Sequence, residues 1–446
     1  MNKRTPPYML DSLMVFLNLA GARGNILLFW LFGLSQMVQV FFVVIFIDFF
    51  YLIFRFRKTK LLANIGFSST LAPLYFTILI LLVNYYNALR EGSGFLLSTG
   101  FVLLIVLFSL IMGALIKDYS RSSTKDIVHS ISKGYIWLSI LTIGGIFLSF
   151  ILDIMFGLQR TPIEAEFLAS NIENGSRYYR SFFSIIRDEG EMRVPFFQKF
   201  GTFTGLFHES QSSTHNIIPC LILLLGFSKS MKIRVTIILS GLLFMLFSIS
   251  VMSILVVALC LCIFFLINSK HRSFGMLIGV SATFTFILLI LQMDKSSVLQ
   301  NFVLDRLDTD NRSQLYSVSM NAWTFSPNTL LGSNFLNTKY VLEIMNIGGA
   351  KSDVGYIPFL LLLGYIITFF LNTIKLLSIN NKKARAVGFA SLYFILHSSK
   401  IGMPMLILTL PVLLIYLQHL SLNIYGRTKV SHNFSQSNFV PKQSFQ

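Results

Sequence analysis

Arginine residues gather in two polar stretches of an otherwise apolar chain. A guanidinium group keeps its proton and can hold a phosphate or carboxylate with two parallel hydrogen bonds. These side chains are therefore candidates for binding the pyrophosphate group of a lipid-linked substrate, and attraction to anionic lipid headgroups is the alternative reading. The candidates are Arg177, Arg180, Arg187, Arg193, Arg306 and Arg312.

Proton-accepting side chains lie where the polar stretches meet apolar segments. His208, Glu209 and His215 precede one apolar run, and Asp353 precedes another. Ionisable groups beside a membrane are costly to bury, and a carboxylate or imidazole there can take the proton of a sugar hydroxyl. The alternative is structural: hydroxyl side chains after Glu209 would cap the next helix, and Asp353 would be a helix N-cap.

Metal chemistry is not expected from this set. His208 and His215 are seven residues apart and could share one face of a helix, but no third ligand follows at a suitable spacing. We therefore expect neither a metal nor another cofactor.

The segment that carries three of the arginines has the pattern of a surface helix. Arg177 and Arg180 are three residues apart, and Arg187 follows two turns later. Ser176–Arg187 is therefore predicted to be an amphipathic helix on the membrane surface, with Tyr178 and Ile186 among the side chains that face lipid.

The rest of the chain must hold these loops at a membrane. The 446 residues are 54% hydrophobic and only 12% charged, whereas a soluble domain carries about 25% charged residues. Apolar runs of about 20 residues recur and predict an all-α, polytopic bundle of about 11 or 12 spans. The expected spans are 8–21, 26–54, 61–83, 95–116, 134–156, 207–227, 233–249, 251–267, 274–292, 354–374, 386–399 and 402–422.

The distribution of charge predicts the orientation of these spans. The net charge of +17 comes from short basic clusters between apolar runs, which argues against nucleic-acid binding and fits the positive-inside rule. With both termini in the cytoplasm, two large periplasmic loops remain on the other side. The predicted parts are N-terminal spans at 1–156, a first loop at 157–206, central spans at 207–292, a second loop at 293–353, C-terminal spans at 354–422 and a polar tail at 423–446.

Three short motifs resemble those of the O-antigen (oligosaccharide repeat-unit) polymerases, a family related to the O-antigen ligases. Gly205-Leu-Phe-His208-Glu209-Ser210 is similar to the family's segment before a central span. Arg312, followed by Pro327 and Gly332, is similar to a segment of its second loop, and Ser352-Asp353-Val-Gly355-Tyr356 to the start of the next helix. The number of spans and the two long loops also match.

The resemblance implies a metal-independent membrane glycosyltransferase. It would join undecaprenyl-pyrophosphate-linked oligosaccharide repeat units at the periplasmic face of a bacterial inner membrane, where it would meet membrane lipids, a flippase and a chain-length regulator. The arginines would hold the departing pyrophosphate, and Glu209, His208, His215 or Asp353 would take the acceptor proton. The periplasmic His of the ligases is missing, with Asp353 in that region, which favours a polymerase over a ligase.

A flippase or exporter of lipid-linked oligosaccharides is the rival from another class. It predicts charged residues throughout the spans, lining a central cavity. Here the spans are nearly free of charge and the polar residues lie in the loops, which favours catalysis at the outer surface.

Overall fold

Helices make up most of the structure, which is a computed structural model. It describes residues 8–21, 25, 27–32, 37–56, 68–92, 94–121, 126–157, 161–163, 177–181, 184–188, 202–207, 210–248, 253, 256–260, 263, 328–334, 354–401 and 409–426. Within these ranges, five helices are long and apolar enough to cross a membrane, and two shorter helices are also apolar. The chain is therefore a helical membrane protein, as predicted, whereas the number of 11 or 12 spans stays a prediction.

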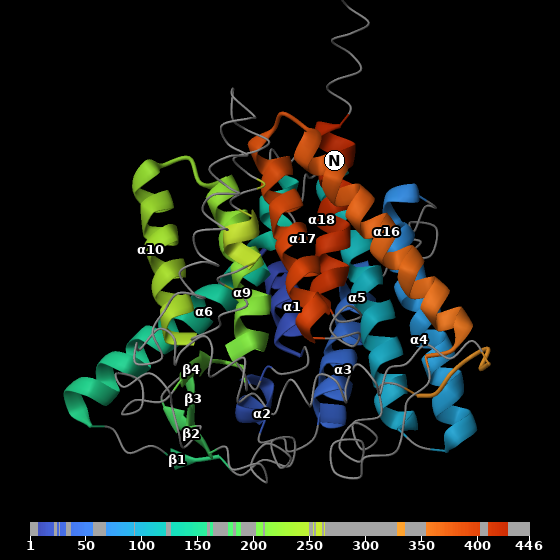
Figure 1. The fold of residues 1–446 in the computed structure, drawn as a ribbon, viewed down its shortest axis with the longest axis horizontal. Coiled ribbons are helices and arrows are strands. Elements are labelled where there is room, and N and C mark those ends of the chain that lie inside the picture. The colour runs from blue at the N-terminus through green and yellow to red at the C-terminus, as the bar shows by residue number, and fades with distance from the viewer. Residues whose placement is uncertain are drawn as a thin grey trace, which may run out of the picture.

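Four short strands follow one another between an earlier and a later set of helices (Figure 1). Before the first long loop lie α1 (Tyr8–Ala20), α2 (Leu27–Phe32), α3 (Met37–Phe56), the 3-10 turn η2 (Ser69–Leu71), α4 (Ala72–Glu91), α5 (Phe95–Arg121) and α6 (Ile127–Phe156). The strands are β1 (Thr161–Pro162), β2 (Arg177–Ser181), β3 (Ser184–Asp188) and β4 (Thr202–Gly205). The later helices are α9 (Ser210–Phe227), α10 (Met231–Ser248), α16 (Tyr356–Ser378), α17 (Lys382–Ile401) and α18 (Thr409–Tyr425).

The two longest helices follow directly from their sequences. α5 has 27 residues and α6 has 30, so each is about 40 Å long or more at roughly 1.5 Å per residue. Asp126 caps the start of α6 by accepting a hydrogen bond from the amide of His129 at 3.3 Å. Gly157 ends the helix with a left-handed conformation (φ 55°), which glycine adopts without strain.

Two predicted spans were wrong in their boundaries. The run 26–54 forms two helices, α2 and α3, and Gly33 with neighbouring polar residues lies between them in the sequence. The run 61–83 was placed too early, because α4 continues to Glu91. Asn84 and Asn87 made the second half of α4 look polar, yet both are fully buried and donate hydrogen bonds within the protein.

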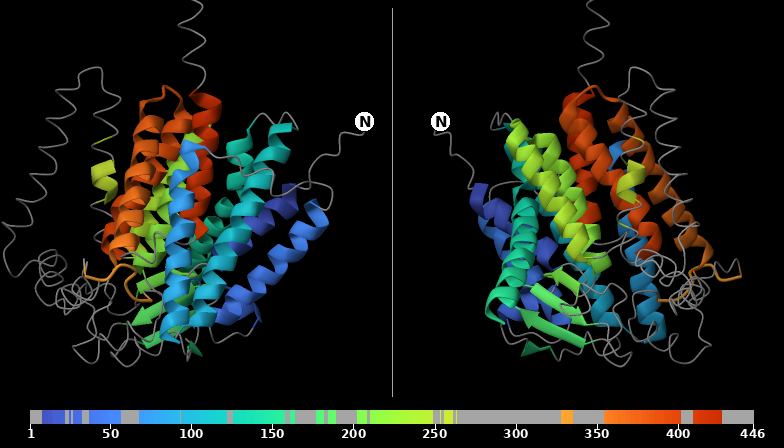
Figure 2. Two further views of the ribbon diagram at one scale, coloured as in Figure 1. Left: turned by 90° about the vertical axis from the view of Figure 1, so that its right-hand side faces the viewer. Right: turned by 60° about the vertical axis from the view of Figure 1, so that its left-hand side comes forward.

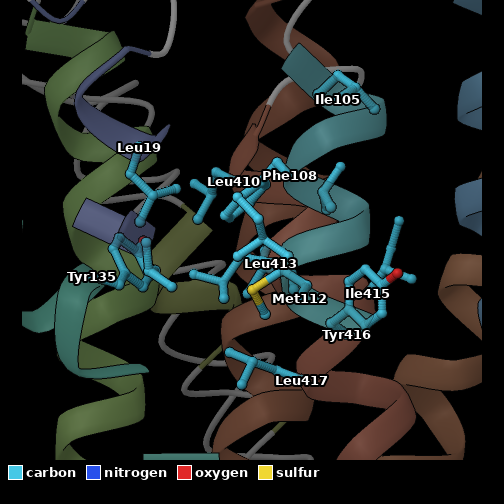
Figure 3. Packing of buried hydrophobic residues seen from close by; sticks show 14 of the residues in the cluster. Leu19, Ile105, Phe108, Met112, Tyr135, Leu410, Leu413, Ile415, Tyr416 and Leu417 are labelled. Atoms are coloured by element: carbon cyan, nitrogen blue, oxygen red, sulfur yellow. The ribbon is translucent and has the colours of Figure 1, made fainter. Parts of the chain in front are cut away.

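The centre of the bundle is built around α18, whose residues from Thr409 to Gln418 are all buried. Figure 3 shows Leu410, Leu413 and Leu417 of this helix packed towards Phe108 of α5 and Tyr135 of α6. Small residues allow the closest helix contacts. Gly134 of α6 lies against the backbone of α1, and Gly226 of α9 lies against Ala386 of α17, with no room for a Cβ at either glycine. A mostly apolar core of this kind suits a membrane bundle.

Polar side chains join the helices at one end of the bundle. Asp126 at the start of α6 forms an ion pair with Lys383 of α17. Lys382 donates to the carbonyl of Ser228, between α9 and α10, at 2.9 Å. These contacts join chain connections that the sequence assigns to the cytoplasm. We call this end of the bundle the basic end. It is the upper end in Figure 1.

A second polar cluster lies at the basic end between α1, α3 and α5. Asp11 is buried and accepts hydrogen bonds from Tyr51 at 2.5 Å and Tyr119 at 2.9 Å. Arg55 lies 3.5 Å from Asp11 and forms a second ion pair with Asp118. The cluster therefore joins the predicted cytoplasmic ends of three helices.

The opposite end carries the described parts of both long loops, and we call it the loop end. The four strands form an antiparallel sheet in the order β1-β2-β3-β4 at this end, which is the lower end in Figure 1. Residues 328–334 lie beside the end of α4 there (Figure 2). Both loops thus meet the bundle on the same side.

Candidate functional site

The arginine-bearing segment of the first loop is a β-hairpin. The prediction of an amphipathic helix at Ser176–Arg187 was wrong: Arg177 pairs with Asp188 and Arg180 with Ile185 in antiparallel register. Because successive residues of a strand point to opposite faces, positions 177 and 180 lie on opposite faces of the hairpin, whereas a helix would have put them on one.

The side chains of this segment also face the protein interior where lipid contact was expected. Tyr178 and Ile186 were expected to face lipid, but both are buried within the protein. Ser149 of α6 donates to the carbonyl of Ser181 at 3.1 Å, which ties β2 to the bundle. Arg180 remains exposed at the surface of the loop end.

The sheet also fixes the beginning of α9. Gly205 ends β4 with φ +66° and lies so close to Thr142 and Ile146 of α6 that a side chain would collide with them. The hydroxyl of Thr204 donates to the carbonyl of Phe207 at 2.5 Å, and Phe207 pairs with Asn25 in an isolated bridge. The turn after β4 is therefore held from three sides just before the predicted base residues.

Only one of the predicted bases lies within the described residues. His208 and Glu209 fall between Phe207 and the first residue of α9, outside the described part. The described part of α9 begins at Ser210, so the expectation that His208 and His215 share one helical face lies outside the described residues. Asp353 is also outside, and Gly355, not Asp353, is the N-cap residue of α16.

His215 is buried at the centre of a polar cluster between α9 and α17. Its Nδ1 atom lies 3.2 Å from Nδ1 of His397, which is also fully buried. His397 Nε2 lies 3.0 Å from the hydroxyl of Ser253, and Ser253 donates to the hydroxyl of Thr214 at 2.6 Å. Four polar side chains from three separate parts of the sequence thus form a continuous hydrogen-bonded chain.

Aromatic rings enclose the two imidazoles. Tyr393 stacks on His397, with ring centroids 5.4 Å apart, and its hydroxyl lies beside Ser253 and Thr214. Phe394 lies on the other imidazole, 4.7 Å from the ring of His215. Packing on these faces fixes the ring planes, so the hydrogen-bonding direction of each nitrogen is defined.

The second loop is held at the loop end by α4. Asn87 donates to the carbonyls of Leu331 at 2.8 Å and Ser333 at 3.3 Å. Arg90 donates to the carbonyl of Gly332 at 2.6 Å, and the carboxylate of Glu91 accepts from the amide of Asn334 at 3.0 Å. We call these three side chains of α4 the loop clip.

The clipped segment in turn caps α16. The amides of Tyr356 and Ile357 donate to the carbonyls of Thr329 at 2.9 Å and Leu330 at 3.0 Å. The first amides of a helix have no partner within the helix, so these bonds satisfy groups that would otherwise be unpaired. The second loop and the start of α16 therefore form one unit with α4.

The predicted phosphate-binding residues are only partly placed. Arg180 is described in full, whereas Arg177 and Arg187 are described by their strand positions alone. Arg193, Arg306 and Arg312 lie outside the described residues. The hydrogen bonds of His215 run to α17, not to the sheet that carries Arg180. The predicted clustering of arginines around a base therefore stays a prediction.

His397 and Ser253 were missed by the sequence reasoning. His397 lies in the predicted span 386–399, and an ionisable residue inside an apolar span is a functional candidate by default. That signal was present in the sequence, but nothing in the spacing indicated its partner. Within the described residues, no group of three or more His, Cys, Asp or Glu side chains is arranged to hold a metal ion.

Comparison with protein-family models, curated proteins and solved structures finds no match to this chain. A functional assignment therefore rests on the residues of the chain and their arrangement.

Proposed function

We propose that this chain is a membrane glycosyltransferase that joins undecaprenyl-pyrophosphate-linked oligosaccharide repeat units into a surface polysaccharide. The observation that carries the proposal is that the described parts of both long loops lie at one end of the bundle, opposite the basic end. Under the positive-inside rule the basic end faces the cytoplasm, so the loop end faces the periplasm of a bacterial inner membrane. The chemistry would take place there.

The reaction needs two kinds of group at the loop end. A hydroxyl oxygen of the acceptor unit attacks the anomeric carbon of the donor glycan, and the bond from that carbon to the pyrophosphate breaks with its electron pair on the phosphate oxygen. Cationic side chains stabilise the departing pyrophosphate, and a base takes the hydroxyl proton. Exposed Arg180 suits the first role, together with the other predicted arginines of the loops.

The described core does not favour the rival reading of a flippase. A central polar cavity would need charged side chains along the spans. Among the described residues, the fully buried carboxylates are Asp11 and Asp48. Asp11 is held in the cluster at the basic end, and Asp48 accepts from Asn18 at 2.8 Å. Each of the two carboxylates therefore has at least one oxygen bonded to a neighbouring helix.

Reconstitution tests the proposal directly. The purified protein is placed in liposomes with one undecaprenyl-pyrophosphate-linked repeat unit, and the glycan lengths are separated by electrophoresis. We expect a ladder of longer glycans and release of undecaprenyl pyrophosphate. An unchanged length distribution would overturn the proposed activity.

Variants of Arg180 then test its role. Arg180→Ala should reduce chain extension at least about tenfold, since a charge-assisted hydrogen bond is worth about 1.5–3 kcal/mol. Arg180→Lys keeps the charge but loses the planar fork, so an intermediate rate is expected. Lys232→Ala, an exposed cation at the basic end, is the matched control and should extend chains normally. Equal rates in all three variants would remove Arg180 from the site.

A further inference from the structure

The protons in the buried polar cluster can be assigned from its hydrogen bonds. Ser253 has a single hydroxyl proton and donates it to Thr214 at 2.6 Å. Its oxygen must then act as an acceptor towards His397, whose Nε2 lies 3.0 Å away. His397 therefore carries its proton on Nε2.

The tautomer of His397 determines that of His215. A buried imidazole without charge carries a proton on one nitrogen only, and burial of a charged ring is unfavourable. Nδ1 of His397 thus presents a lone pair, and the proton in the 3.2 Å contact belongs to Nδ1 of His215. Nε2 of His215 is then left with a lone pair.

His215 Nε2 is buried and, among the described residues, has no hydrogen-bond partner. Buried polar atoms are paired in nearly all protein structures, and an exception calls for a functional or structural explanation. A neutral imidazole with one nitrogen held by a neighbour and the other free has the arrangement of a general base.

We propose that Nε2 of His215 takes the proton of the acceptor hydroxyl during glycosyl transfer, and that His397 and Ser253 are positioning residues that hold His215 in the required tautomer. The inference rests on the proposed function. As the O–H bond breaks, its electron pair forms the bond to the anomeric carbon, and the proton moves to His215. Nδ1 of the resulting imidazolium still donates to His397.

The position of the pair along the helices suits this role. His215 lies five residues into α9, about 7.5 Å from its first residue at roughly 1.5 Å per residue. His397 lies four residues before the end of α17. α9 begins directly after the sheet of the loop end, so the pair lies within two turns of the predicted reaction surface. Because Nε2 of His215 is buried, the side chains around it must move to admit a hydroxyl group, while the bond between Nδ1 of His215 and His397 stays closed.

Nuclear magnetic resonance tests the tautomer independently of activity. The protein is labelled with ¹⁵N-histidine and placed in lipid nanodiscs, and His215→Gln assigns the His215 signals. We expect a protonated Nδ1 and an unprotonated Nε2 on His215. A proton on Nε2 would mean that the hydrogen-bond chain runs the other way, which would overturn the inference.

Two substitutions of His397 separate its contacts. The side-chain oxygen of Asn lies the same number of bonds from Cα as Nδ1 of His, so His397→Asn can still accept from His215. The amide of Gln lies as far from Cα as Nε2, so His397→Gln can still meet Ser253 but no longer accepts from His215. Ser391→Ala, a buried hydroxyl on the same helix, is the control that should keep full activity.

The chain-extension assay then gives distinct outcomes. We expect His397→Gln to lower kcat about 100-fold or more with little change in KM, and His397→Asn to stay within about tenfold of the unaltered protein. Equal kcat for the two variants would overturn the positioning role. If the unaltered protein forms no polymer, the proposed function itself fails, and the NMR result then shows separately whether the assigned tautomer was correct.

Discussion

Asn87 should control whether the second loop stays attached to the bundle. It is fully buried and donates to two backbone carbonyls of the clipped segment, at 2.8 and 3.3 Å. Asn87→Ala removes both bonds and leaves the carbonyls of Leu331 and Ser333 without this donor. A net hydrogen bond is worth about 0.5–1.5 kcal/mol, and a buried acceptor without a partner costs about 1–3 kcal/mol. The attachment should therefore weaken by about 2 kcal/mol.

This change is large enough to measure. A loss of about 2 kcal/mol corresponds to a roughly 30-fold rise in the population of the detached segment. Hydrogen–deuterium exchange of the amides of Tyr356 and Ile357 reports it, because their bonds to Thr329 and Leu330 break when the segment leaves. Their exchange should accelerate by a similar factor.

A second asparagine provides the matched control. Asn372 of α16 is buried and donates to the carbonyl of Thr70 at 2.9 Å, near the basic end. Asn372→Ala removes a bond of the same kind from the same helix that the clipped segment caps. It should leave the exchange of Tyr356 and Ile357 unchanged. If both variants accelerate exchange equally, or neither does, the loop clip is not what holds the second loop.

Three further predictions test the packing and the orientation of the bundle. Gly134→Leu should prevent recovery of folded protein, because a side chain there collides with the α1 backbone. Gly144 in the same helix has open space around it. Gly144→Ala should therefore stabilise the folded protein by up to about 1 kcal/mol in thermal unfolding. Asp126→Asn should cost less than about 1 kcal/mol in that assay, since its ion pair is partly exposed, and a loss above about 2 kcal/mol would contradict this. In a cysteine-free background, Asn328→Cys should react with a membrane-impermeant thiol reagent in intact cells and Asn380→Cys only after lysis; the reverse pattern would invert the proposed sidedness.

Hydropathy was sufficient where a helix depends on its own residues. The apolar runs 95–116 and 134–156 lie within α5 and α6, because burial in lipid rewards every apolar side chain irrespective of its neighbours. The extra residues of these helices, such as Lys117 and His129, are polar and extend towards the basic end. Local composition therefore predicts that such helices exist, but it predicts their ends less well.

The hairpin of the first loop could not be predicted from periodicity. A half-buried strand alternates apolar and polar residues, but Ile185 and Ile186 are neighbours and both are fully buried. The register shifts between these two residues, where β3 pairs with β4. Contact with α6 and β4 therefore determines the burial of this segment, and the spacing of arginines that suggested a helix was coincidental.

Two helices whose apolar runs contain polar residues, α4 and α17, hold polar contacts at the loop end. The second half of α4 carries Asn87, which binds the second loop, and the weak span of α17 carries His397, whose partner His215 is 182 residues away. A polar side chain lowers the apolar signal of its helix, and its burial is tolerated only when a distant partner satisfies it. In a helical membrane protein, long-range polar contacts should therefore be sought first in spans whose apolar signal is weak. By that criterion His397 was identifiable as a candidate from the sequence, although its partner required the folded structure.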